Sequence, residues 1–144
     1  MNVARILATK GSGIVTLHSE QTVREAIALL CEYNIGALVV VNEEKQPIGI
    51  LSERDITRAI NRNEQIFSEI VANLMTKDVI TGVPQDDLRV VGNTMTEKRF
   101  RHLPIVDKGK LVGIVSIGDV VKAQRDQYEG EIDTLQTQIL ADEI

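Results

Sequence analysis

The chain has 144 residues and a formal net charge of −5, and its length is typical of a single domain. Hydrophobic residues make up 43% of the chain but aromatic residues only 3%, so we expect a core of aliphatic side chains. The negative charge and the few aromatic side chains argue against a general nucleic-acid binder, which needs a basic face and stacking platforms. The sequence shows no signal peptide and no apolar run near the roughly 18 residues of a membrane span. We therefore expect a cytoplasmic protein that binds neither nucleic acid nor membrane.

One sequence pattern occurs twice in the chain. Ile14-Val15-Thr16 matches Val79-Ile80-Thr81, and residues 49–55 match residues 113–119, each pair lying about 65 positions apart. Self-similarity at a nearly fixed offset identifies a repeated folding unit, here of about 55 residues. A unit of that size is marginal on its own, so we expect the two copies to share a core.

In chain order, the first copy follows a glycine-rich segment, Gly11-Ser12-Gly13, which predicts a flexible insertion or a short loop around a phosphate. A short apolar strand over 14–17 leads into a helix whose apolar residues share one face. The continuous apolar run over 37–41 predicts a buried strand, and a turn joins it to a second strand over 48–51. Another helix is expected from Asp55 onward. The apolar face of the first helix comprises Val23, Ala26, Ile27, Leu30 and Cys31.

The second copy repeats the same order of elements. We expect strands over 79–83, 103–106 and 111–115, with a helix after the first strand and another from Asp119 onward. The pattern strand-helix-strand-strand-helix, occurring twice, predicts an α/β (α+β) protein with small sheets covered by helices. The apolar face of the first helix of this copy is thinner and comprises Leu88, Val91, Gly92, Met95 and Thr96.

Each copy ends in the motif G-h-h-S-x-x-D, where h is apolar, with Ser52 and Asp55 in the first copy and Ser116 and Asp119 in the second. Serine followed three residues later by an acid forms a helix capping box, which is a purely structural explanation. A functional explanation is that a hydroxyl, an acid and free N–H groups meet at a helix start, a place suited to phosphate or ribose. The residues alone leave both explanations open.

The two copies closely resemble the cystathionine-β-synthase (CBS) domain. Leu74-Met75-Thr76 is similar to the family's I-M-T lead-in, as is Ile6-Leu7, and residues 101–107 resemble its R-H-L-P-V-V-D strand. The resemblance covers residues 4–126 and implies a tandem CBS pair, or Bateman module, with repeats at 4–61 and 74–126. In this family the two sheets pack face to face with approximate twofold symmetry. Two clefts between them bind adenosyl ligands.

The resemblance also implies which residues contact a ligand. The acid after the second strand binds ribose and the preceding serine contacts ribose or phosphate, while residues of the first strand cradle the base. The start of the next strand lines the cleft. The residues at these positions are Ile14, Val15, Thr16, Ala37, Ser52 and Asp55 in the first copy, and Val79, Ile80, Thr81, His102, Ser116 and Asp119 in the second.

Cationic residues distinguish the second copy from the first. The segment 98–102 reads Lys-Arg-Phe-Arg-His where the first copy has only uncharged residues. In the family the phosphates in one repeat's cleft are usually met by the other repeat, so Arg99, Arg101 and His102 are expected to face Ser52 and Asp55. The alternative is a solvated helix end that places positive charge beside the helix C-terminus. Arg54 is open to either a phosphate or a subunit salt bridge.

The sequence gives little support for catalysis. Cys31, the only cysteine, excludes an internal disulfide, and its place on an apolar helix face predicts a buried side chain rather than a nucleophile. His18 fits a turn, and no nucleophile elbow, Walker loop or metal-binding cluster is present. We expect a sensor that needs no cofactor, binds AMP, ADP, ATP or NAD in preference to S-adenosylmethionine, and signals to a regulated protein. The alternative is a ligand-independent dimerisation or scaffold module.

The chain continues past the second copy as a helical extension over 127–144. Val121, Tyr128 and Leu135 recur every seven residues, and Ile132 and Ile139 are offset from them by three or four. An apolar stripe of this kind on a helix that runs into solvent favours association with a partner helix or subunit. Because CBS pairs commonly form flat dimers, we expect a homodimer.

Overall fold

The structure, a computed structural model, describes residues 1–11 and 13–142. Five α-helices, five strands and two short 3₁₀ turns are assigned in these residues. The first part of the chain forms α1 (Val3–Lys10), β1 (Thr16–Leu17), α2 (Val23–Tyr33), β2 (Ala37–Val41), β3 (Pro47–Ser52) and α3 (Glu53–Arg62). The second part forms η1 (Ile66–Ser68), η2 (Val71–Asn73), α4 (Leu88–Lys98), β4 (His102–Asp107), β5 (Lys110–Ser116) and α5 (Ile117–Asp142).

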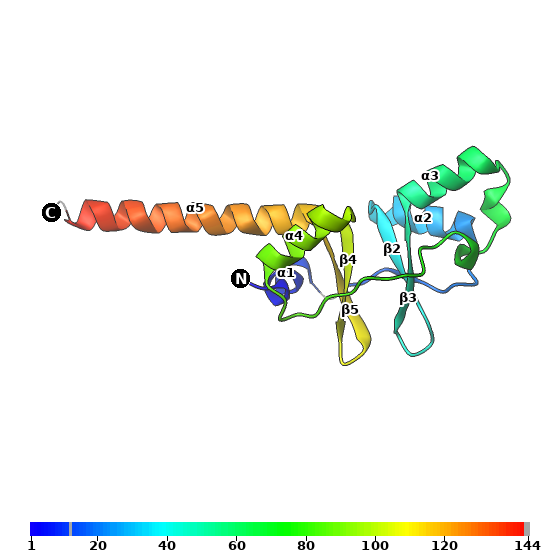
Figure 1. The fold of residues 1–144 in the computed structure, drawn as a ribbon, viewed down its shortest axis with the longest axis horizontal. Helices are drawn as coiled ribbons and strands as arrows, with labels where there is room; N and C mark the ends of the chain where they lie inside the picture. Colours follow the sequence, from blue (N-terminus) through cyan, green and yellow to red (C-terminus); the bar gives the residue numbers. More distant parts are fainter. Residues whose placement is uncertain (12, 143–144) are drawn as a thin grey trace.

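The strands form two small sheets, one in each repeat. In the first sheet β1 pairs parallel with β2, and β2 pairs antiparallel with β3, whereas the second sheet is the antiparallel hairpin β4–β5. Figure 1 shows the two hairpins side by side, with α2 and α3 beside the first and α1, α4 and α5 beside the second. The predicted α/β class and the twofold repeat of elements are confirmed.

Three apolar clusters hold the molecule together. One cluster lies within each repeat, around Leu38 and Leu51 in the first and around Leu103 and Ile105 in the second. The third cluster joins the sheets and contains Val39 and Val41 of β2, Leu111 of β5, and the partly buried Ile14 and Ile114. The two copies therefore share a core, as their size predicted.

Each repeat is completed by the segment that leads into the other repeat. Helix α1, which the sequence did not predict, precedes the first repeat but buries Val3 and Ile6 in the core of the second. The N–H of Leu88 donates to the Met1 carbonyl at 3.2 Å, beside a bridge that joins Asn2 to Asp87. In the first repeat, Ile66 and Val71 of the linker are buried in the same way. The linker thus closes the first core as α1 closes the second.

The glycine of each G-h-h-S-x-x-D motif allows this close approach. A Cβ atom at Gly49 would overlap the thioether of Met75, and a Cβ atom at Gly113 would overlap a methyl group of Leu7. The Leu7 and Met75 side chains come from the two segments that resemble the family's lead-in. Glycine at these two positions is therefore explained by packing between lead-in and strand.

The predicted strand over 79–83 is wrong, because pairing there is reduced to a single parallel bridge between Gly82 and Ile105. The N–H of Gly82 donates to the Pro104 carbonyl at 2.9 Å, and the N–H of Val106 donates to the Gly82 carbonyl at 2.8 Å. The next bonds of a parallel ladder on either side require the N–H groups of Pro84 and Pro104, which proline lacks. The first copy has no proline at these positions, and β1 pairs over two residues.

Two further expectations are corrected or refined. Cys31 is exposed, so its predicted burial is wrong: the buried stripe of α2 is narrow, comprising Val23, Ala26 and Leu30, and Cys31 lies to one side of it. The predicted strand over 14–17 is paired only at Thr16 and Leu17.

Helix α5 is continuous over Ile117–Asp142 and extends well beyond the body of the protein (Figure 1), while residues 143–144 of the predicted extension lie outside the described residues. Within the described residues, no helix is long and apolar enough to cross a membrane.

Replacing Pro104 with valine tests the explanation for the missing strand. Valine occupies the matching position of the first copy, Val39, and its N–H can donate to the Ile80 carbonyl. We expect the amide at position 104 to become protected from hydrogen exchange by about tenfold or more relative to an unpaired loop amide. The amide of Val106 serves as an internal control and should stay protected in both proteins. Fast exchange at position 104 would show that proline is not what limits the pairing.

Candidate functional site

A cavity of about 340 Å³ lies between the two repeats, within the range of small-molecule sites. We call it the Ser116 cleft, because Ser116 at the end of β5 lines it. Its walls come from both repeats, as the family resemblance implied. The lining residues are Leu7, Lys10, Gly11, Gly13, Ile14, Val15, Asn34, Ile35, Gly36, Ala37, His102, Gly113, Ile114 and Ser116.

Local backbone structure places the first repeat's part of this wall. Helix α2 ends at Asn34, whose left-handed φ of 52° turns the chain sharply toward β2. Gly36 lies against His102, because a Cβ atom there would be in van der Waals contact with Nε2 of the imidazole at 3.7 Å. Ile14 and Val15 lie just before β1 and contribute apolar surface suited to a planar base.

The Ser116 and Asp119 pair forms a capping arrangement at the start of α5. The N–H of Ser116 donates to Oδ2 of Asp119 at 2.8 Å, and the N–H of Asp119 donates to Oγ of Ser116 at 3.1 Å. The structural explanation of the motif therefore holds in this repeat. Among the described residues, however, only Oδ2 of the carboxylate accepts hydrogen bonds, so Oδ1 keeps its capacity for a ligand.

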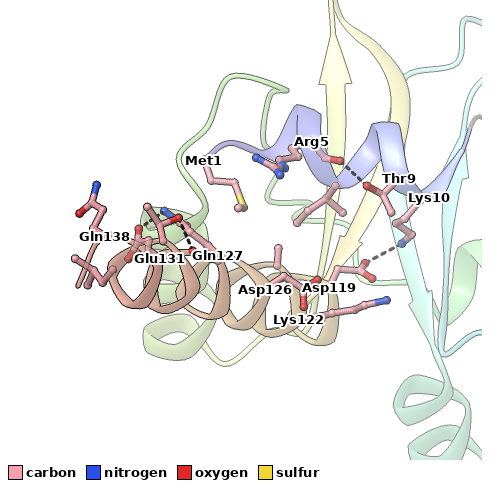
Figure 2. A pocket seen from close by; sticks show the side chains of 15 residues that line it. Met1, Arg5, Thr9, Lys10, Asp119, Lys122, Asp126, Gln127, Glu131 and Gln138 are labelled. Carbon is pink, nitrogen blue, oxygen red and sulfur yellow. Dashed lines mark hydrogen bonds and ion pairs between the residues drawn. The ribbon is translucent and has the colours of Figure 1, made fainter. Parts of the chain in front are cut away.

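Lys10, the last residue of α1, contacts this carboxylate. Its ammonium donates to Oδ2 of Asp119 at 2.8 Å and to the Ile114 carbonyl at 2.9 Å. Figure 2 shows the pair bridging α1 and α5, with Lys122 on the same helix but outside the pair. Because α1 precedes the strands of the first repeat but packs on the second, it brings the ammonium group of Lys10 to the acid of the second repeat.

The contact with Lys10 changes the acidity of Asp119. Burial alone would raise the pKa of this carboxyl, but hydrogen bonds from Lys10 and Ser116 and the charge of Lys10 outweigh burial and lower the pKa below 3.8. The pKa of His102 is also lowered, but here burial is the main cause and brings the pKa of the imidazole below 6.5. The charge of Lys10 lowers this pKa further, while the charge of Asp119 opposes the shift. His102 is therefore neutral near pH 7 and offers a hydrogen bond rather than a positive charge.

We call Ser52 and Asp55, with the predicted facing residues Arg99 and Arg101, the Ser52 site. His102, the third cationic residue expected to face Asp55, instead lines the Ser116 cleft. Oδ2 of Asp55 accepts from the N–H of Ser52 at 2.9 Å and from its Oγ at 3.1 Å, a full capping box. In the described part of the chain, Asp55 makes no ion pair like that of Asp119. Arg99 and Arg101 are both exposed, and Arg99 caps α4 with a left-handed φ of 58°.

The structure brings some of the predicted site residues together and leaves others apart. Ile14, Val15, Ala37, His102 and Ser116 line one cavity, and Asp119 is linked to it through Lys10. Thr16 is half-buried in β1, while Val79, Ile80 and Thr81 follow an extended path whose last two side chains are exposed. Arg54 and His18 are exposed on the surface. Ser12 of the predicted glycine-rich loop lies outside the described residues, but Gly11 and Gly13 line the cleft.

A second, larger groove of about 900 Å³ runs between α1 and α5 (Figure 2). Its side chains are mainly polar and charged, including Arg5, Lys122, Asp126 and Glu131. Of the acids in the two repeated motifs, only Asp119 borders it. Both hollows have apolar surface, but only the smaller cavity is lined by strand residues of both repeats and by a serine of the repeated motif, so it is the better candidate for a nucleotide.

Comparison with known proteins identifies the family. The family model for the CBS domain matches residues 4–62 and 71–126. The chain belongs to the CBS-domain family. It is 36% identical over 109 residues to the uncharacterized protein MJ1225 of Methanocaldococcus jannaschii, covering 76% of this chain but only 39% of that protein. It is 33% identical over 116 residues to the CBS domain-containing protein YhcV of Bacillus subtilis, covering 81% of this chain and 82% of that protein.

Solved structures of CBS-domain proteins share this fold. The CBS-domain containing protein ATU1752 from Agrobacterium tumefaciens is 35% identical, with a TM-score of 0.82 over 86% of this chain and 99% of that chain. The CBS domain pair of MJ0100, in complex with 5′-methylthioadenosine and S-adenosyl-L-methionine, is 27% identical, with a TM-score of 0.79 over 88% of this chain and 98% of that chain. PAE2072 from Pyrobaculum aerophilum, complexed with AMP, is 28% identical, with a TM-score of 0.75 over 83% of this chain and 89% of that chain.

The lowered pKa of Asp119 predicts how the Lys10 contact depends on pH. Because the folded pKa lies below 3.8, the stability that this carboxylate contributes is present above pH 3.8 and is lost as the pH falls through the folded value. Replacing Lys10 with methionine should lower the free energy of unfolding at pH 7 by about 0.5–1 kcal/mol, and this difference should shrink below pH 3.8. Urea denaturation between pH 7 and pH 3 measures both effects. A matched Lys122→Met variant should change stability little, and a difference for Lys10→Met that does not vary with pH would contradict the assignment.

Proposed function

We propose that this protein is a sensor module that binds an adenosyl nucleotide between its two CBS repeats and signals occupancy to a regulated protein. The observation that carries the proposal is the Ser116 cleft, where apolar walls from the first repeat meet Ser116 of the second, and where Lys10 links the cleft to Asp119. Asp119 supplies an acceptor for ribose hydroxyls, and Ile14 and Val15 supply apolar surface for a base. The ligands of MJ0100 and PAE2072, which all carry adenosine, support the same ligand class.

The Ser52 site is the better candidate for a nucleotide with phosphates. Asp55 has no lysine to displace, and the guanidinium groups of Arg99 and Arg101 belong to the facing repeat, where they can pair with phosphate oxygens. The matching segment of the first repeat, Asn34 to Gly36, carries no charge. Arg99 also holds a left-handed backbone that asparagine, its counterpart at position 34, adopts at lower cost. A strained backbone at this position supports a functional role for the arginine.

This preference favours AMP, ADP, ATP or NAD over S-adenosylmethionine, whose sulfonium carries a positive charge toward arginine. Catalysis forms no part of the proposal. Among the described residues no group of three or more His, Cys, Asp or Glu side chains is arranged to hold a metal ion, and Cys31 does not line the cleft. The protein is therefore proposed to act through binding and a change of shape or rigidity.

A ligand-independent scaffold is the second candidate. It is favoured by the capping bonds of Ser52 with Asp55 and of Ser116 with Asp119, which give both motifs a structural purpose without any ligand. The two functions differ in one measurable respect, because only the sensor is stabilised by an adenosyl compound.

We also propose that the protein is a homodimer that uses the exposed stripe of α5. The side chains of Val121, Tyr128, Ile132, Leu135 and Ile139 are between 52% and 65% exposed, and they follow one face of a helix that projects from the body (Figure 1). A second copy offers the same stripe at the same spacing, which suits the self-complementary contact of a twofold dimer.

The nucleotide prediction is tested by thermal unfolding with AMP, ADP, ATP, NAD and S-adenosylmethionine, using GMP as the control. At 100-fold excess over the dissociation constant, a ligand stabilises the native state by about 2.7 kcal/mol, which raises the melting temperature by roughly 2–8 °C. We expect Asp55→Ala to remove most of this shift and Asp119→Ala less of it. Arg99→Asn should weaken phosphate binding without lowering the melting temperature of the free protein. If no adenosyl compound shifts the melt and calorimetry is also silent, the scaffold function is correct.

The dimer prediction is tested by removing residues 127–144. Sedimentation of the full chain at micromolar concentration should show a dimer, and the shortened chain should dissociate at concentrations about tenfold higher or more, because most of the apolar stripe is lost. Nucleotide binding should persist, since the deleted residues touch neither Ser/Asp pair. A full-length monomer would end the proposal. Replacing the exposed Glu129 instead of an apolar residue provides a control that should leave the dimer intact.

A further inference from the structure

The lysine that reaches across to Asp119 sets the two nucleotide sites apart. Lys10 lines the Ser116 cleft, and its ammonium lies 2.8 Å from the carboxylate that is proposed to bind ribose. The side chains of Lys10 and Asp119 are 39% and 25% exposed, so the pair is accessible to solvent. Lys10 lines the Ser116 cleft, and both residues line the neighbouring groove between α1 and α5. No described lysine or arginine pairs with Asp55 in this way.

We propose that Lys10 is a specificity-determining residue of the Ser116 cleft, where it occupies Asp119 until a ligand bearing phosphate draws it away. The inference rests on the proposed nucleotide binding and adds a rule of selection to it. The selected ligands are adenosine compounds with at least one phosphate, and neutral adenosine compounds are disfavoured.

The selection follows from charge balance. A ribose diol that takes both oxygens of Asp119 must displace the Lys10 ammonium, which then loses its counter-charge beside the cavity. A phosphate in the same ligand offers a new partner and restores a charge-assisted hydrogen bond. A neutral nucleoside offers no new partner for the ammonium group. Its binding free energy is therefore reduced by the whole contribution of the Lys10–Asp119 pair. The same reasoning disfavours a ligand with a positive sulfonium.

The position of Lys10 allows the required movement. It is the last residue of α1, and Gly11 follows it in a left-handed conformation with a φ of 85°. The ammonium sits on a flexible four-carbon stem that can swing between partners without moving the helix. Its second contact, to the Ile114 carbonyl, keeps it beside the cavity wall when it leaves the carboxylate.

The experiment measures calorimetric affinities for ADP and adenosine in a protein carrying Asp55→Ala, which silences the Ser52 site. Adding Lys10→Met should weaken ADP binding by about tenfold or more and strengthen adenosine binding, so that the ratio of the two affinities falls by more than tenfold. Lys10→Arg keeps the charge and should preserve the preference for ADP. Lys122→Met, three residues beyond Asp119 but outside the pair, should leave both affinities unchanged.

Three results would overturn the inference. If Lys10→Met changes both affinities by the same factor, the lysine affects the cleft only through its structure. If the Asp55→Ala protein binds neither probe while the wild type binds ADP, the Ser116 cleft is not a nucleotide site, although the proposed function stands. If the wild type binds neither ADP nor adenosine, the proposed function fails together with the inference.

Discussion

The packing of each lead-in segment against the repeat that it does not introduce is the contact on which the rest of the structure depends. Val3 and Ile6 of α1 are 0% and 6% exposed in the core of the second repeat, and full burial of such side chains contributes about 1.5–3 kcal/mol each. The linker completes the first repeat through Ile66 and Val71, which are also buried. Because each core borrows residues from a distant segment, the two repeats fold as one unit, and neither has a complete apolar core by itself.

This exchange also builds the candidate site. When α1 crosses to the second repeat, it ends with Lys10 beside Asp119, and the chain then returns to the first repeat past Ile14 and Val15. The Ser116 cleft is consequently enclosed by residues on both sides of the pseudo-twofold. Lys10, Ile14 and Val15 line one cavity with Ser116, and the ion pair links Lys10 to Asp119, which lies 109 positions further along the chain. The site thus combines the local Ser/Asp motif with a lysine that only the topology brings to it.

Features that depend on local sequence could be predicted, whereas features that depend on contacts between distant segments could not. The repeat, the buried strands and the Ser/Asp caps depend on local spacing and were predictable, because period and capping chemistry are local properties. The weak pairing near Gly82 depends on missing N–H groups at Pro84 and Pro104, and the two prolines in the sequence are the local signal of this interruption. Exposure of Cys31 depends on how wide a stripe of α2 the sheet covers, which apolar residue type alone does not determine. The contact between Lys10 and Asp119 joins residues that only the exchange of lead-in segments brings together.

The double use of the Ser/Asp motif suggests how binding at the site reaches the rest of the molecule. In both repeats one carboxylate oxygen caps a helix while the other is unbonded among the described residues, so a ligand and the helix N-terminus share one side chain. Asp119 belongs to the first turn of α5, a 26-residue helix whose far part carries the exposed apolar stripe. A ligand that takes Asp119 from Lys10 breaks a bridge between α1 and α5 and at the same time acts on the cap of α5. In the proposed dimer, the cap and the apolar stripe belong to one helix, so ligand binding at the cap of α5 is expected to alter the contact with the second subunit.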